Sequence, residues 1–188
     1  MFLMSNNTRF YLLLALVVLL AVIIYILNLL YKKRALNQVI EALEENLSSS
    51  PEKFNVRKYK TKYSDISCES ETSLFLVKII HNSSTSEICV NSPLMWQVRR
   101  SKNDTKNSYL KNIDGLMKHE FSPLELNGRK AKKIYVIYKD SRGLLMYINE
   151  SEMRFIEPRT NVHGATVVSF NDLVNNDAVE LTDFEKRY

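Results

Sequence analysis

The chain has 188 residues, of which 25% are charged and 45% are hydrophobic, and its formal net charge is +5. This balance is that of a globular protein and excludes a disordered chain. Four glycines and four prolines likewise exclude a collagen-like sequence. The length allows one membrane anchor and one domain of about 150 residues.

An apolar run occupies residues 10–31, and Asn28 is its only strongly polar residue. A helix of this length measures about 33 Å, enough to cross a hydrocarbon core of about 30 Å. Tyr11 and Tyr31 lie at its ends, where the headgroup layer favours tyrosine. A cleaved signal peptide would have a shorter apolar stretch and a small-x-small cleavage site, which does not follow this run. The sequence therefore predicts a short tail at 1–9 and an uncleaved transmembrane anchor at 10–31.

The residues that flank the anchor give conflicting indications of its orientation. Lys32, Lys33 and Arg34 follow it, whereas only Arg9 and the terminal amine precede it. The positive-inside rule therefore favours a cytosolic domain. Long domains cross membranes largely regardless of charge, however, and an even number of cysteines is typical of exported domains. We expect a single-pass protein of a bacterial inner membrane with a periplasmic domain; a cytosolic domain is the alternative.

Residues 32–50 are predicted to form an amphipathic helix that continues from the anchor. Five apolar residues recur at helical spacing and form one stripe: Leu36, Val39, Ile40, Leu43 and Leu47. The stripe either packs on its own domain or forms an interface with a partner protein or a second copy. Two heptads are too few to predict a coiled coil.

Residues 51–170 are predicted to form an α+β domain, an antiparallel sheet backed by one or two helices, followed by an acidic polar tail at 171–188. Pro51 ends the preceding helix. Strand-like segments at 72–82 and 86–91 flank a polar turn and predict a hairpin.

Further strands are predicted in the second half of this domain. Segments 133–138 and 144–148 are apolar at successive positions, so both faces of each should be covered, and a turn at 139–143 joins them. A tight turn is expected at Asn127-Gly128 and another strand at 165–170. A helix is expected over 103–119, with one apolar face formed by Tyr109, Leu110, Ile113, Leu116 and Met117.

The sequence contains no recognisable catalytic or metal motif. His81, His119 and His163 are its only histidines, and no two of them have the helical spacing of metal ligands. It lacks a nucleophile elbow and the glycine-rich phosphate-binding motifs. We therefore expect no enzyme activity, no metal and no cofactor.

Charge is distributed unevenly along the domain. Residues 96–142 contain twelve basic and five acidic residues, a charge of +7, and residues 143–188 carry −4. The candidate basic patch consists of Arg99, Arg100, Arg129, Lys130, Lys132 and Lys133. It is either an ordinary solvated surface or a site for anionic lipid headgroups or an acidic partner. Nucleic acid is disfavoured because the stretch lacks repeated aromatic residues for base stacking.

Cys68 and Cys89 are the only cysteines, and they flank the strand-like segment 74–80. If they lie on adjacent strands, their Cα atoms can approach within the roughly 7 Å that a disulfide needs. We predict an intramolecular disulfide, with two buried free thiols as the alternative.

These features predict a non-catalytic, membrane-anchored accessory or regulatory protein. We expect the lipid bilayer and a partner membrane protein, or a second copy, as its interaction partners, and transmission of an envelope signal. Two alternatives remain open. The first is a sensor that holds a small apolar ligand between sheet and helix, lined by 133–138 and 144–148. The second is a membrane tether with a cytosol-facing domain.

Overall fold

A computed structural model of the chain describes residues 6–82, 85–92, 95–100, 109–113, 116, 129–139, 143–149, 152–155 and 161–175. Its first element, α1 (Asn6–Ser48), is a helix of 43 residues. The predicted continuation of the anchor into the amphipathic helix is therefore confirmed. The helix ends shortly before Pro51, as expected. The chain divides into two compact units, Met1–Asn37 and Gln38–Tyr188, and their boundary falls within α1.

Among the described residues, α1 is the one helix that is long and apolar enough to cross a membrane. Its large apolar side chains from Phe10 to Leu30 are exposed, because no other part of the described chain covers them. Exposed apolar surface on this scale is stable in lipid rather than in water. The helix therefore fits a single-pass membrane protein.

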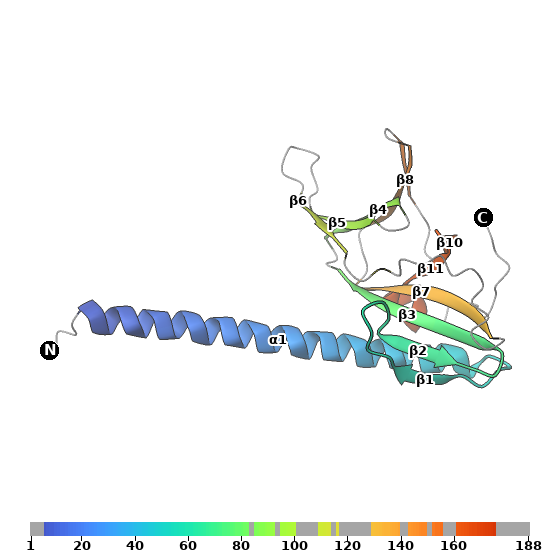
Figure 1. The fold of residues 1–188 in the computed structure, drawn as a ribbon, viewed down its shortest axis with the longest axis horizontal. Coiled ribbons are helices and arrows are strands. Elements are labelled where there is room, and N and C mark those ends of the chain that lie inside the picture. Colours follow the sequence, from blue (N-terminus) through green and yellow to red (C-terminus); the bar gives the residue numbers. More distant parts are fainter. Residues whose placement is uncertain are drawn as a thin grey trace. The chain divides into compact units, whose positions relative to one another are not determined.

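Two mixed sheets follow α1 (Figure 1). Sheet A has six strands in the order β1-β2-β3-β7-β11-β10. Its strands are β1 (Asn55–Lys58), β2 (Ile66–Glu69), β3 (Ser73–His81), β7 (Lys130–Tyr138), β10 (Asn161–Val162) and β11 (Ala165–Ser169). Sheet B has five strands in the order β6-β5-β4-β8-β9. Its strands are β4 (Glu87–Ser92), β5 (Met95–Arg100), β6 (Tyr109–Asn112), β8 (Gly143–Asn149) and β9 (Glu152–Phe155). The last described element is a short helix, α2 (Phe170–Val174), capped by the side chain of Ser169.

The α+β class is confirmed, but the sheets are mixed rather than antiparallel throughout. The pairs β3–β7, β7–β11 and β4–β8 are parallel. Both predicted hairpins are wrong as well, because β3 and β7 belong to sheet A whereas β4 and β8 belong to sheet B. β3 and β7 instead pair with each other over nine residues, from Ser73 opposite Lys130 to His81 opposite Tyr138. The residue pattern of each segment thus predicted these strands correctly. Their proximity along the chain suggested the wrong partners.

The helix predicted over 103–119 is wrong where the structure describes it. Tyr109–Asn112 forms β6, an antiparallel edge strand that pairs with β5. Pairing with a neighbouring strand here overrides a weak helical pattern. The expected turn at Asn127-Gly128 lies outside the described residues, and so does most of the predicted acidic tail.

The side chains of sheet A face two apolar cores. One core lies between the sheets and includes Ile80, Ile88, Val90, Trp96, Tyr135, Ile137, Leu144 and Val167. Because strand residues alternate between faces, the intervening buried side chains lie on the opposite face of sheet A. They include Ile66, Cys68, Phe75, Val77, Ile79, Ile134, Val136 and Val168. The expectation that both faces of 133–138 are covered is confirmed, since all six residues are buried.

The end of α1 contributes to the domain on this second face. Val39 and Leu43 are fully buried and Leu47 is almost so. Gln38 accepts a hydrogen bond from the Tyr138 hydroxyl, and the Asn46 side-chain amide donates to the carbonyl of Leu173 in α2. In the view of Figure 1 the end of α1 overlaps β1 and β2, and Glu44 of α1 acts on the thiol of Cys68 in β2.

Candidate interaction surfaces

The apolar stripe that the sequence identified is largely internal. Val39, Leu43 and Leu47 are buried by the domain itself, whereas Leu36 and Ile40 are half-buried. The sequence left open whether the stripe packs on its own domain or forms an interface, and the three buried positions pack on the domain. Their side chains are not accessible for an interface between copies.

The two cysteines do not lie on adjacent strands. Cys68 is in β2 of sheet A and Cys89 is in β4 of sheet B. Both are buried free thiols, so the expected disulfide is absent between them. The prediction required the two cysteines to meet on adjacent strands, whereas the strand order places them in different sheets.

Burial changes the acidity of both thiols. Burial, reinforced by the nearby carboxylates of Glu44 and Glu69, raises the pKa of Cys68 to about 12. Burial also raises the pKa of Cys89; Glu87 acts in the same direction and Arg99 opposes it. A raised pKa keeps the thiol protonated and therefore unreactive at neutral pH.

The predicted basic patch is divided between the sheets. Arg99 lies in sheet B and pairs with Glu87 at 2.8 Å, whereas Arg129 pairs with Glu69 of sheet A at 3.5 Å. Lys132 follows in β7, and Lys133 is buried there. Arg100 and Lys130 occupy the end of β5 and the start of β7, respectively. The described members of the patch therefore do not share one strand or one sheet.

Within the described residues, no group of three or more His, Cys, Asp and Glu side chains could hold a metal ion. His81 ends β3 and has its ring near that of Tyr138, and His163 lies in the turn between β10 and β11. His119 lies outside the described residues.

The structure reveals a surface on sheet B that the sequence did not predict. Strand alternation places Met95, Gln97 and Arg99 of β5 on the face of sheet B that points away from sheet A. On this outer face, Asn91 donates a hydrogen bond to Gln97, which donates to Asn112, both at 2.9 Å. We call this the amide row.

Two large apolar side chains lie on the same outer face and remain open to solvent. Met95 is 50% exposed and Phe155 is 72% exposed. Phe155 pairs with Leu145, and a Cβ atom at Gly143 would come within 3.2 Å of its ring. The outer face therefore combines an ordered polar row with exposed apolar groups, a composition common in protein interfaces.

A second surface comprises the last two residues of β1 and the connection toward β2 (residues 57–63), which we call the basic loop. Arg57, Lys58, Lys60 and Lys62 are exposed, and no acidic residue interrupts them. Tyr59 and Tyr63 are also exposed, at 46% and 38%. The ammonium group of Lys62 lies 5.7 Å from the centroid of the Tyr63 ring, a distance suited to a cation–π contact.

The basic loop has a defined backbone. Tyr59 N–H donates to the Asp65 carbonyl at 2.8 Å, and Thr61 N–H donates to the Ser64 carbonyl at 2.9 Å. The Thr61 hydroxyl accepts hydrogen bonds from the backbone N–H groups of Tyr63 and Ser64. These contacts close a turn in which the hydroxyl of Thr61, rather than a backbone carbonyl, accepts hydrogen bonds from two backbone N–H groups.

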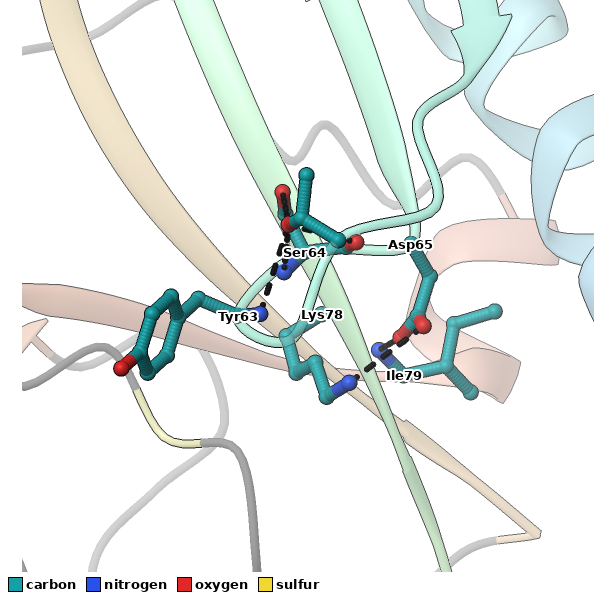
Figure 2. A network of polar contacts seen from close by, with 6 residues as sticks. Tyr63, Ser64, Asp65, Lys78 and Ile79 are labelled. Atoms are coloured by element: carbon teal, nitrogen blue, oxygen red, sulfur yellow. Dashed lines mark hydrogen bonds and ion pairs between the residues drawn. The ribbon is translucent and has the colours of Figure 1, made fainter.

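Asp65 fastens this turn to sheet A, as Figure 2 shows. Its backbone N–H donates to the Val77 carbonyl at 2.8 Å. One carboxylate oxygen accepts from Ile79 N–H at 2.9 Å, and the other pairs with Lys78 at 3.3 Å. The sequence "RKYKTKY" contained a signal for this surface, since basic residues and tyrosines alternate there.

Several buried polar atoms in the described part of the chain lack a hydrogen-bond partner. They are the indole nitrogen of Trp96, the hydroxyl of Ser86 and both amide atoms of Asn82. Trp96 belongs to the core between the sheets, where its ring packs edge-on against Tyr135. A buried donor without a partner is costly, so each such atom requires a water molecule, a ligand or some other explanation.

Comparison with known proteins finds no matching family model, no similar curated protein and no similar solved structure.

Proposed function

We propose that this chain is a non-catalytic, membrane-anchored accessory protein whose domain binds a partner membrane protein and transmits an envelope signal. The outer face of sheet B is the observation that carries this proposal. It presents Met95 and Phe155 beside the amide row, and such apolar anchors with ordered polar neighbours are what a partner surface can cover. A membrane tether favours a partner in the same bilayer, because tethering raises the effective concentration of the two proteins.

The arrangement of α1 supports the signalling part of the proposal. The candidate span and the buried positions Val39 and Leu43 belong to one helix. A partner that shifts the helix in the bilayer would thereby act on residues of the domain core. Small shifts of a packed helix are a common form of signal transmission.

The test places a photo-crosslinking amino acid at Phe155 in cells that contain the full chain. One discrete adduct with an integral membrane protein is expected, and Met95→Glu should reduce its yield at least fivefold. The matched control is Lys53, an exposed residue outside the sheets, where the same amino acid should give no such adduct. Adducts between differently tagged copies would indicate self-association, and equal adducts at both positions would contradict the proposal.

The extracytoplasmic side of an inner membrane is part of this proposal. The free thiols remove the disulfide as an argument for export, but buried, unreactive thiols are compatible with an oxidising compartment. Lys32, Lys33 and Arg34 favour the second candidate, a tether with a cytosol-facing domain. A reporter that is active only outside the cytosol, fused at Tyr188, distinguishes them. Activity is expected, and a silent reporter with stable protein would establish the cytosolic tether.

Another candidate function is a sensor for a small ligand, favoured by the unpartnered indole nitrogen of Trp96 between the sheets. A ligand acceptor at that nitrogen would satisfy it. The full chain in nanodiscs would be screened by thermal shift with bile salts and fatty acids. A bound ligand at a hundredfold excess over its dissociation constant stabilises the fold by about 2.7 kcal/mol. A shift that Trp96→Phe abolishes would support this function, and no shift with any compound would exclude these ligand classes.

A further inference from the structure

The basic loop concentrates positive charge and exposed tyrosine on one short turn. Four of its seven residues are Arg or Lys and two are Tyr. In the described part of the chain, none of these basic side chains lies within ion-pair distance of an acidic one. Asp65 is the first acidic residue after the loop, and its carboxylate already pairs with Lys78 and accepts a hydrogen bond from Ile79 N–H. The loop therefore presents uncompensated positive charge to its surroundings.

The loop lies at the end of sheet A where α1 enters the domain. Its base is held at Ile79, two residues before His81, which pairs with Tyr138 in β7. The step from Ile79 to His81 along β3 is about 7 Å, and the step from β3 to the neighbouring β7 is about 5 Å. The Tyr138 hydroxyl in turn bonds to Gln38, the first residue of the domain unit. The basic loop and Gln38 thus belong to the same end of the sheet.

Chain length limits how far this end can lie from the bilayer. Gln38 follows Tyr31, the end of the apolar run, by seven residues, all of them within α1. Seven helical residues span about 10 Å. The Gln38 end of the domain is therefore separated from the end of the candidate span by only seven residues of chain.

We propose that the basic loop binds anionic lipid headgroups on the surface of the membrane into which α1 inserts. Lys and Arg near an anionic surface each contribute favourably to binding. Tyrosine rings favour the headgroup layer, and lysine stems lie along apolar surface while their ammonium groups reach the phosphates. The loop supplies both residue types on a turn whose shape is already fixed. This inference requires only the membrane anchor and does not depend on a protein partner.

The experiment uses the full chain in nanodiscs of phosphatidylcholine, with or without one quarter phosphatidylglycerol. Tyr63→Trp introduces an indole into the basic loop, and lipids brominated near the headgroup quench indoles that touch the bilayer. The unsubstituted chain supplies the background, because its single tryptophan, Trp96, is buried in the core. Quenching of the introduced indole should be at least twofold stronger with phosphatidylglycerol and should fall as salt is raised.

Two double variants of equal charge test the role of the loop residues. Lys60→Gln/Lys62→Gln should shift the equilibrium toward the lipid-free loop by about 30-fold, or about fivefold per lysine. Lys53→Gln/Lys111→Gln removes two exposed lysines elsewhere and should leave quenching within experimental error. Quenching that is independent of phosphatidylglycerol would overturn the proposal, and so would equal losses in the two doubles. All four lysines are exposed, and unchanged circular dichroism would establish that the variants fold.

Discussion

The hydroxyl of Tyr138 donates a hydrogen bond of 2.5 Å to the side-chain oxygen of Gln38, and so joins the end of β7 to α1. The Tyr138 ring also packs against Phe170 of α2, with ring centroids 5.0 Å apart. One side chain thus connects both helices to sheet A. Tyr138→Phe keeps the ring and removes the hydroxyl that donates to Gln38. We expect it to lower the free energy of unfolding by about 1 kcal/mol.

Denaturation of the full chain in detergent, followed by Trp96 fluorescence, would measure this loss. Gln38→Ala should cost a similar amount, and the double variant should cost clearly less than the sum of the two single changes. Strictly additive effects would show that the two side chains do not interact.

Leu43 is fully buried by its own domain, so truncating it should leave a cavity. We expect Leu43→Ala to destabilise the domain by about 2–5 kcal/mol. Glu41→Ala, at an exposed position on the same helix, should stay within about 0.5 kcal/mol of the native chain. A loss at Leu43 that disappears at high protein concentration would instead indicate a seam between copies.

Local features of this fold could be predicted from the sequence, whereas the long-range strand pairing could not. The span, the continuous helix and the strands at 73–81, 130–138 and 165–169 follow from composition and periodicity within each segment. The strand partners do not follow from them, because β3 pairs not with β4, the next strand in sequence, but with β7 across 48 intervening residues. Parallel strands such as β3 and β7 are stable when both faces of the sheet are buried, and the segments that cover those faces are distant in the chain.

The same distinction applies to the candidate sites. The cysteine prediction depended on the strand order, because it required adjacent strands, and Cys68 and Cys89 lie in different sheets. The sequence identified the apolar stripe on α1 but left open what it packs against, and the structure shows Val39 and Leu43 buried within the domain. In contrast, the basic loop is a local feature, and its alternation of charge and tyrosine was readable in the sequence.

Cys68 and Cys89 should behave as buried free thiols. In the folded chain, a maleimide should label both at least a hundredfold more slowly than in urea, because the thiolates are buried and scarce. Both should label in urea without a reductant. Mass spectrometry of the full chain would count the labels, and labelling that requires a reductant would show that a disulfide forms after all.

The raised pKa of Cys68 also predicts a loss of stability at alkaline pH. Below about pH 8.5 the thiol is protonated in both folded and unfolded chains, so it contributes no pH dependence. Between that value and the folded pKa of about 12, only the unfolded chain releases the proton. Rising pH therefore favours unfolding by up to about 1.4 kcal/mol per pH unit.

Urea denaturation between pH 8 and 11 would compare the native chain with Cys68→Ala. Lysines and tyrosines titrate in both proteins, so the difference between the two slopes isolates Cys68. The variant should lose less stability as pH rises. Parallel curves would mean that Cys68 ionises equally in the folded and unfolded chains.

Asp65 provides a sharp test of whether the shape of the basic loop matters as well as its charge. Its carboxylate holds Lys78 and Ile79 N–H, and its backbone groups pair with Val77 and Tyr59. Asp65→Ala removes the carboxylate contacts and should cost about 1–3 kcal/mol, since hydrogen bonds to a charged group are lost at a partly exposed site. Amide exchange in residues 59–64 should accelerate.

The same variant raises the net charge of the chain by one unit. If charge alone governed lipid binding, Asp65→Ala would strengthen the response to phosphatidylglycerol. If binding requires the fixed turn, the response should weaken, because ordering a mobile loop on the membrane costs conformational entropy. We expect the response to weaken, and Asp65→Asn, which retains an acceptor for Ile79 N–H, should lose less of it. A stronger response in Asp65→Ala would leave the basic loop as a source of charge whose shape is unimportant.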